Sequence, residues 1–286
     1  MKNKSEFIKK IQNGYSCRNL SLTGFDLSHS NLCGADFRGA DLSDANFSYC
    51  NLSGAKFQNS NLRNANFSHA IIAGATMVIA RISGIPIGNV NHTYFRSAAL
   101  AGADFSLSKL EKADFVDSEL QNCIFEGAFI RECEFGRTRL GKTNFTNCEI
   151  QNCDMSNISA HMLSASKCSF LNCAFPSADL TETDFINCEF NNCQLSSAML
   201  VDSKFRHVRL TDCDFTSVYG VRMEMVCNHL MGVVFNKATL EHSHWEDCNI
   251  YQSTFKEAVL SGATIRGTSG SSDFRGCIGL IRNDGE

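Results

Sequence analysis

A large apolar residue recurs at every fifth position along the first part of the chain. The series begins at Leu22 and ends at Ile87, and mostly polar or small residues lie between its members. A period of five fits neither a helix of 3.6 residues per turn nor a simple alternating strand. The members are Leu22, Leu27, Leu32, Phe37, Leu42, Phe47, Leu52, Phe57, Leu62, Phe67, Ile72, Met77, Ile82 and Ile87.

The same period resumes after one interruption and then holds almost to the end of the chain. Phe95 lies eight residues after Ile87, three more than the repeat allows, and the extra residues fall in the segment PIGNVNHTY. From Phe95 the series continues to Ile265, and 18 of the 22 phenylalanines occupy positions of the two series. This concentration indicates a single structural position that is filled again and again.

Small residues precede the large ones by two positions, for example Ala35 before Phe37 and Ala113 before Phe115. Residues two apart in an extended segment share a side, and a narrow interior packs best when large and small residues alternate. The pattern therefore predicts coils of four five-residue sides that pair edge to edge. The two series hold 14 and 35 inward positions, which corresponds to about twelve coils.

Most of the fifteen cysteines fall in the small inward position. A column of parallel side chains does not converge on a metal ion, and parallel Cβ vectors are poorly aimed for disulfides. Buried free cysteine behaves as a small hydrophobic residue, so we expect inert core thiols, as in the segment NCEFNNCQL at 187–195. The eleven are Cys50, Cys123, Cys133, Cys148, Cys153, Cys168, Cys173, Cys188, Cys193, Cys213 and Cys248.

Composition and charge narrow the class of protein. The net charge is −4, which argues against a general nucleic-acid binder. Residues 1–90 carry nine Lys/Arg against five Asp/Glu, whereas residues 91–286 carry seventeen against twenty-five. No run of about 18 apolar residues predicts a membrane span, and the charged N-terminal stretch does not resemble a secretory signal. With an odd number of cysteines, this favours the reducing cytoplasm; an uncleaved address for a specialised secretion system would leave no such mark.

The regular frame also predicts the organisation of the chain. We expect an N-terminal cap at 1–17, coils at 18–87, an insertion loop at 88–94, further coils at 95–265, and a C-terminal cap or tail at 266–286. The segment EFIKKIQN, with Phe7, Ile8 and Ile11 on one side, predicts a short helix that covers the first coil. In the tail the frame is lost, and the residues expected to cover the other end are Phe274, Ile278, Leu280 and Ile281.

Three inward positions hold residues that are too small for the repeat. They are Ala160, Ala165 and Gly220. An underfilled core position predicts a local departure from regular packing. We therefore expect distorted corners or bulges in the segments SNISAHMLSAS and SVYGVRMEM.

Two groups of residues suggest chemistry, and neither is persuasive. Cys227 stacks between His207 and Asp247 at the spacing of 20, but a nucleophilic triad needs its histidine between nucleophile and carboxylate. The segment HSHWEDC suggests a metal site with His242, His244 and Cys248, which Glu224 would complete, but Cys248 belongs to the inward set. We expect no catalytic residue, no metal and no cofactor.

The outward positions offer two candidate binding surfaces. Asp114, Glu134 and Asp154 recur once per coil beside Glu132, although acidic residues and asparagine are also common at that repeat position. Like charges in register repel, so a maintained stripe would indicate a use. The second candidate is a set of outward apolar residues, Ile124, Phe129, Met199 and Tyr219, which would mark an interface unless the frame slips and buries them.

The repeat also resembles a known family. The motif A-[DN]-[LF]-x-x, seen in CGADFRGADLSDANFSYCNLSGAKF, resembles the pentapeptide-repeat family over about residues 18–278. This resemblance implies an all-β fold, a right-handed quadrilateral parallel β-helix with a short helical N-terminal cap. The cysteine-rich coils, such as SELQNCIFEGAFIRECEF, resemble the quinolone-resistance and microcin-immunity style of the family, whereas the first third has the plain style.

The resemblance implies two functions. The first is a non-catalytic, protein-binding scaffold whose outer faces carry the recognition, a class that includes effectors which bacteria deliver into host cells. The alternative is a DNA-mimicking protein that binds and protects a type II topoisomerase such as gyrase. Both predict a protein partner and no direct contact with nucleic acid.

Overall fold

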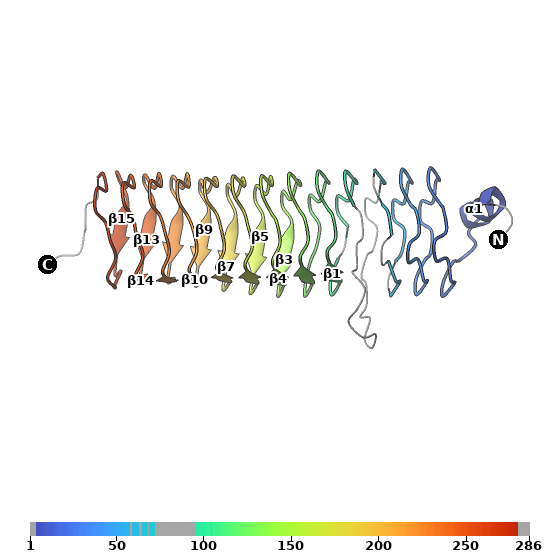
Figure 1. The fold of residues 1–286 in the computed structure, drawn as a ribbon, viewed down its shortest axis with the longest axis horizontal. Helices are drawn as coiled ribbons and strands as arrows, with labels where there is room; N and C mark the ends of the chain where they lie inside the picture. Colours follow the sequence, from blue (N-terminus) through green and yellow to red (C-terminus); the bar gives the residue numbers. More distant parts are fainter. Residues whose placement is uncertain are drawn as a thin grey trace. The chain divides into compact units, whose positions relative to one another are not determined.

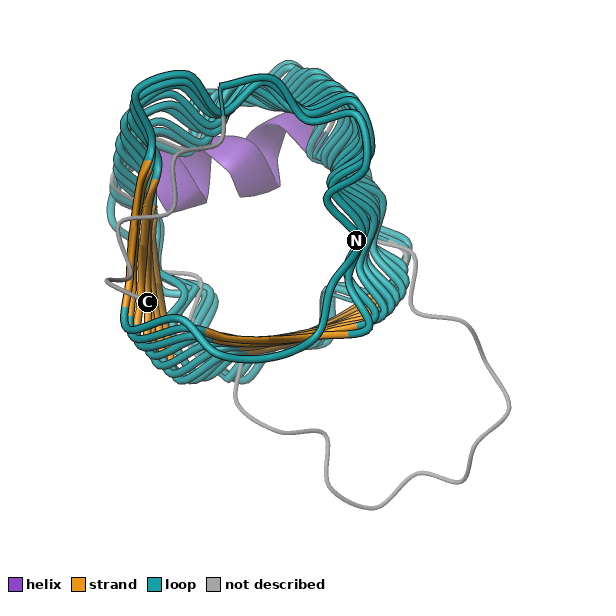
Figure 2. Cartoon of the chain, turned by 90° about the vertical axis from the view of Figure 1, so that its left-hand side faces the viewer, coloured by secondary structure: helices purple, strands orange, loops and turns teal. Residues whose placement is uncertain are grey.

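The computed structural model describes residues 4–57, 59–62, 65–67, 69–71, 95–103 and 105–279. The chain forms two compact units, Met1–Asn144 (unit 1) and Phe145–Glu286 (unit 2). Each unit consists of coils that follow one another along the chain (Figure 1). In end view a coil has four sides, and the strands occupy two adjacent sides (Figure 2).

Regular elements are short. Helix α1 spans Lys4–Gln12, and every strand has three residues. Unit 1 contains β1 (Lys109–Glu111) and β2 (Phe129–Arg131), and β3 (Asn144–Thr146) begins on its last residue. Unit 2 contains β4 (Glu149–Gln151), β5 (Ser164–Ser166), β6 (Ser169–Leu171), β7 (Asp184–Ile186), β8 (Glu189–Asn191), β9 (Lys204–Arg206), β10 (Arg209–Thr211), β11 (Glu224–Val226), β12 (His229–Met231), β13 (His244–Glu246), β14 (Asn249–Tyr251) and β15 (Thr264–Arg266).

All described strand pairs are parallel, and their register is the repeat of twenty found in the sequence. Leu210 lies opposite Phe190 on one side and Leu230 on the other. In unit 2 the even-numbered strands β4 to β14 form one sheet, and the odd-numbered strands from β5 to β15 form another. The predicted all-β parallel solenoid is confirmed.

The number of turns that carry strands is smaller than the sequence count. Two strands in unit 1 and six in unit 2 mark about eight turns on one face, against the roughly twelve coils expected. Earlier turns of unit 1 are joined by isolated bridges, such as Asn31 to Asn51, instead of strands.

Each corner is built around a residue with positive φ, two places after the large inward residue. Asn192 adopts φ 51° and Asp212 adopts φ 50° there. Asparagine, aspartate and glycine tolerate this left-handed conformation best, which explains their recurrence at that position. The corners thereby turn the chain after every five residues and keep the inward residues in columns.

The interior is a set of stacked rings and aliphatic side chains. Phe95 and Phe115 stack at 4.7 Å between ring centroids, and Phe170 and Phe190 stack at 4.5 Å. All four rings are buried. Aromatic pairs contribute about 0.5–1.5 kcal/mol each beyond the burial of their area, so the repeated phenylalanine column stabilises the coils strongly.

Helix α1 covers the first coil of unit 1, as the sequence predicted. Phe7 and Ile11 are buried and Ile8 is half-buried. The Phe7 ring meets that of Phe25 edge-on at 5.3 Å, and Gln12 Nε2 donates to the Asn31 carbonyl at 3.1 Å. The helix therefore shields one end of the apolar column and forms a hydrogen bond with a backbone carbonyl of the first coils.

The expected distortions at Ala160, Ala165 and Gly220 are absent from these described segments, and that prediction is wrong. Strand β5 runs through Ala165, which pairs with Phe185 in the ordinary register. The reason is an exchange of volume between the small and the large inward position on one side of a coil. Ile158 and Leu163 occupy the small positions before the two alanines, and both are buried.

Gly220 is compensated in the same way from the next side of the coil. A methyl group on Gly220 would lie 3.1 Å from Leu240 Cδ2 and 3.4 Å from Met223 Sδ. Met223 is fully buried in a small inward position. Its long side chain fills the space that Gly220 leaves, so the coil stays regular.

The frame continues into the C-terminal tail after the loss of one residue, so the expectation that it ends is wrong. Asp273 pairs with Thr254, nineteen residues earlier, and Phe274 stacks on Phe255 at 4.6 Å. Gly270 permits the shortened corner, because it has φ +119° and a Cβ there would collide with the Ile250 carbonyl.

The predicted insertion loop and the predicted C-terminal cap fall wholly or partly outside the residues that the structure describes. The bridge from Ile71 to Ala99 joins residues 28 positions apart, eight more than the usual twenty. The predicted insertion loop at 88–94, and Leu280 and Ile281 of the predicted C-terminal cap, lie outside the described residues. Ile278 is 60% exposed and does not take part in covering the core.

Candidate functional site

The cysteines belong to the interior and not to a reactive site. All fifteen are free, and the eleven predicted to point inward are buried, as is Cys17. The Cys193 thiol donates to the Phe170 carbonyl at 3.4 Å. Burial raises the pKa of Cys248 to about 11, and the neighbouring thiol of Cys153 together with burial raises the pKa of Cys173 to about 12. These groups remain protonated and unreactive at neutral pH.

Thiol labelling checks this arrangement. In the folded protein we expect a soluble aromatic disulfide reagent to label Cys33 rapidly, because it alone among the cysteines is exposed. Cys227 and Cys277, which are half-buried, should react more slowly. The other twelve should react only after unfolding. Rapid labelling of most thiols in the native state would contradict the buried columns.

The His207, Cys227 and Asp247 column occupies corners of unit 2. All three residues have positive φ, and the Cys227 amide donates to the Glu246 carbonyl at 2.9 Å. In the part of the chain that the structure describes, which includes all three residues, no hydrogen bond joins their side chains. The arrangement therefore provides no activated nucleophile.

The histidines of HSHWEDC are also separated from their suspected partners. Cys248 is buried and donates to the Met225 carbonyl at 3.1 Å. His244 Nε2 lies 3.3 Å from Glu246 Oε2, and His242 lies at a corner with φ 57°. Among the described residues, no three metal-ligating side chains converge on a point.

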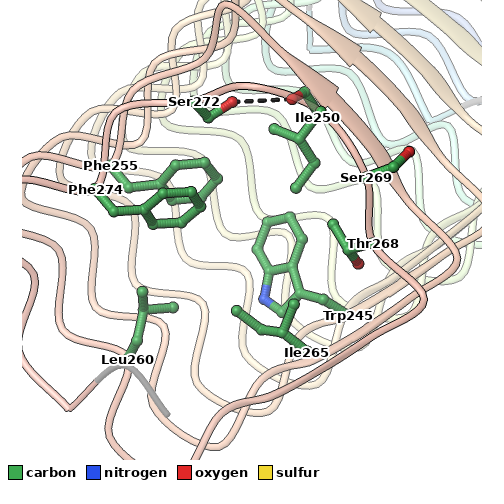
Figure 3. A pocket seen from close by; sticks show the side chains of 10 residues that line it. Trp245, Ile250, Phe255, Leu260, Ile265, Thr268, Ser269, Ser272 and Phe274 are labelled. Carbon is green, nitrogen blue, oxygen red and sulfur yellow. Dashed lines mark hydrogen bonds between the residues drawn. The ribbon is translucent and has the colours of Figure 1, made fainter. Parts of the chain in front are cut away.

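A hollow in the interior of unit 2 has no chemistry of its own. It has a volume of about 60 Å³ and lies among the last inward side chains, including Trp245, Phe255 and Phe274 (Figure 3). Its polar side chains are three hydroxyl-bearing residues and Trp245; the Ser272 hydroxyl donates to the Ile250 carbonyl at 3.0 Å, and the Trp245 indole donates to Ser243 at 2.9 Å. Ligand pockets usually measure about 300–1,000 Å³, so this hollow is a packing defect near an end of the coils.

The residues of the predicted acidic stripe belong to both units. Asp114 and Glu134 are bridge partners in neighbouring coils of unit 1, whereas Asp154 belongs to unit 2. Arg96 binds Asp114 through its Nη2, 2.8 Å from Oδ2, and Asp114 is only 15% exposed. Asp154 accepts a hydrogen bond from the Ser156 amide at 2.8 Å, the ordinary role of an acid in a corner.

Glu132 is likewise matched by cations. Its Oε2 lies 3.4 Å from Lys112 Nζ, and its Oε1 lies 3.0 Å from Arg131 Nε. Exposed ion pairs add little stability, but they cancel the field that an acidic stripe would project. Pairing with these cations reduces the negative potential that Asp114 and Glu132 project from unit 1.

The predicted apolar residues of unit 1 lie on different sides of a coil. Ile124 is exposed and bridges to Asn144. Phe129 lies in β2, opposite Lys109 of β1, and is half-buried. Because the bridge partners of Ile124 and Phe129 are polar residues, these two residues do not form an apolar patch.

Met199 and Tyr219 are brought together, as their spacing suggested. They are bridge partners in neighbouring coils of unit 2, and their exposed fractions are 46% and 48%. Val201 and Val221 follow two places later on the same outward side and are half-buried. We call these four residues the Met199–Tyr219 patch.

A second Met–Tyr pair was missed by the sequence analysis. Met231 and Tyr251 are partners in β12 and β14, with exposed fractions of 54% and 47%. They line a shallow groove of about 260 Å³ whose opposite ridge includes Arg209 and His229. The signal was available, because both residues directly follow an inward residue of the repeat and must point outward.

Comparisons with known proteins agree with this architecture. The family model for pentapeptide repeats matches in eight copies, over residues 16–48, 50–84, 91–127, 178–216 and 229–269. No curated protein matches the chain. No described helix combines the length and apolar character needed to cross a membrane.

Several solved structures are similar to the chain at low identity. HetL, a pentapeptide repeat protein involved in heterocyst differentiation regulation from the cyanobacterium Nostoc, is 17% identical with a TM-score of 0.29, covering 100% of this chain and 99% of its own. Full-length QnrB1, a plasmid-mediated fluoroquinolone resistance protein, is 19% identical with a TM-score of 0.29, covering 63% and 84%. A thylakoid-lumen pentapeptide repeat protein from Arabidopsis thaliana is 22% identical with a TM-score of 0.17, covering 51% and 73%. The family model covers more than half of the sequence, and the chain belongs to the pentapeptide-repeat family.

Proposed function

We propose that this pentapeptide-repeat scaffold is non-catalytic and binds a protein partner through the Met199–Tyr219 patch of unit 2. The observation that carries the proposal is the pairing of two large, exposed, apolar side chains in adjacent coils. Tyrosine and methionine are enriched in protein interfaces, and contiguous exposed apolar residues mark an interface more often than scattered ones do.

The packed interior supports a role in binding. Aromatic and aliphatic side chains fill the coils, and the small hollow beside Trp245 holds no ionisable group. The thiols, the most reactive groups in the sequence, are mostly buried, and the neighbouring Cys153 thiol together with burial raises the pKa of Cys173 to about 12. Recognition on an outer face is then the activity that this fold supports best.

Capture of the partner from the cells that produce the protein tests the proposal. After chemical crosslinking, a Met199→Ser/Tyr219→Ser variant should retain less than about a tenth of the partner held by the unchanged protein, because loss of central interface anchors usually costs more than 1–2 kcal/mol. The matched control is Met231→Ser/Tyr251→Ser, the same chemical change on another side of the coil, and it should retain the partner. If Met231→Ser/Tyr251→Ser lost the partner and Met199→Ser/Tyr219→Ser retained it, the partner would bind at the Met231–Tyr251 groove and the proposed patch would be wrong.

The alternative, a DNA-mimicking protector of gyrase, receives less support from the surface. In unit 1 several acids are paired with cations, as in Asp117 with Arg137 at 2.8 Å and Glu119 with Arg139 at 3.0 Å. A gyrase supercoiling assay separates the two functions. Inhibition of supercoiling, or rescue of gyrase from a poison, would favour the alternative.

A further inference from the structure

The Met199–Tyr219 patch has sharp borders along its side of the coil. In the preceding coils of unit 2 the corresponding outward residues are polar, namely Ser159, His161, Asp179 and Thr181. In the following coil they are Thr239 and Glu241. The apolar surface is therefore confined to two coils, which rise together by roughly 10 Å at the usual spacing between strands. A surface of this size fits one or two side chains of a partner.

Backbone groups beneath the patch are already used within the solenoid. The Met199 amide donates to the Ala178 carbonyl at 2.9 Å, and the Leu200 amide donates to the Tyr219 carbonyl at 2.8 Å. A partner cannot add a strand to this side of the coil, because these groups point toward neighbouring coils. Recognition must come from the outward side chains.

The corner beside the patch is electrically balanced. Arg222 donates from Nε and Nη2 to the two carboxylate oxygens of Asp202, at 2.6 and 2.5 Å. These hydrogen bonds lower the pKa of Asp202, so the pair stays ionised and contributes no net charge. The Arg222 guanidinium binds this acid of the neighbouring coil and therefore does not neutralise the other acids near the patch.

Negative charge remains on only one border of the patch. Asp179 is the bridge partner of Met199, and its Oδ1 accepts from the Thr181 amide at 3.1 Å. Glu182 is exposed, and His161 Nε2 lies 4.0 Å from its Oε2. Among the described residues no Lys or Arg forms an ion pair with either acid. The opposite border carries one base, Lys237, and one acid, Glu241.

We propose that the patch receives a protein segment that places an apolar side chain over Met199 and Tyr219, and Lys or Arg beside it over Asp179 and Glu182. This inference rests on the proposed function and names the chemistry of its partner. The apolar contact supplies most of the affinity, because Tyr and Met are buried on binding. The two acids orient the segment and accelerate its encounter.

Selection of displayed twelve-residue peptides on the full-length protein tests the inference. The selected pool is first depleted of peptides that bind the Met199→Ser/Tyr219→Ser variant. Recovered peptides should carry Lys or Arg next to an aromatic or aliphatic residue. Their binding should fall about tenfold or more on Met199→Ser/Tyr219→Ser and roughly three- to tenfold on Asp179→Asn/Glu182→Gln. Added salt should weaken peptide binding to the unchanged protein but not to the Asp179→Asn/Glu182→Gln variant.

The variants separate failure of this inference from failure of the proposed function. Asp179→Asn keeps the oxygen that accepts from Thr181, and Glu182 is exposed, so the double variant should melt like the unchanged protein. Peptides that need Met199 and Tyr219 but bind the Asp179→Asn/Glu182→Gln variant equally well would overturn the charge preference alone. Enrichment of acidic peptides would overturn it as well. Failure to recover any peptide that depends on the patch would overturn both.

Discussion

Replacing Gly220 with leucine destabilises the protein, although the five-residue pattern calls for a large apolar residue at that position. The added side chain would overlap Met223 and Leu240, because even a single methyl group would come within 3.1 Å of Leu240 Cδ2. Overpacking of this kind costs about 1–3 kcal/mol. Met223→Ala alone should cost about 2–5 kcal/mol, because it empties a fully buried position.

Combining the two changes should restore much of the lost stability. Leucine at 220 with alanine at 223 recreates the large–small arrangement of the ordinary coils. We expect the free energy of unfolding of the double variant, measured by urea titration, to be about 0.5–3 kcal/mol higher than the value predicted by adding the two single losses. Gly220→Ala is the graded control and should be nearly neutral. Additive single effects, or a more stable Gly220→Leu protein, would contradict the exchange of volume.

Raising the pH above 9 should remove stability through the buried thiols. Neighbouring thiols and burial raise the pKa of both Cys173 and Cys193 from 9.0 to about 12. Between these values the folded protein holds protons that the unfolded chain has released, so the free energy of unfolding falls as pH rises. The contribution is complete below pH 9 and lost by about pH 12, at about 1.4 kcal/mol per pH unit for each thiol.

Urea titrations at several pH values check this dependence against a matched variant. Cys173→Ala/Cys193→Ala keeps a small residue in each position, as Ala113 does in the corresponding column of unit 1. Its stability should fall less steeply above pH 9, whereas titration of tyrosine and lysine affects both proteins alike. The same slope in the two proteins would show that these thiols do not titrate in the folded state above their ordinary range.

Surface recognition could be predicted only in part from the sequence. The repeat identified Met199 and Tyr219 as outward residues of neighbouring coils, and the structure brings them together. It equally marked Asp114 and Glu132 as outward acids, but it did not show that Arg96 and Lys112 reach them. Long cationic side chains can reach acids in a neighbouring coil, and which acid each one contacts cannot be read from the order of residues in the sequence.

Sequence periodicity by itself determined the solenoid, the twenty-residue register and the inward place of eleven cysteines. It could do so because each coil repeats one packing problem, and a large residue every fifth position has one regular solution. Only the tertiary structure decided that Gly220 and Ala165 cause no bulge, that Gly270 permits a coil one residue shorter, and that Asp114 and Glu132 are paired with cations. These outcomes depend on how volume and charge are shared between neighbouring coils, and such sharing exists only once the coils are stacked.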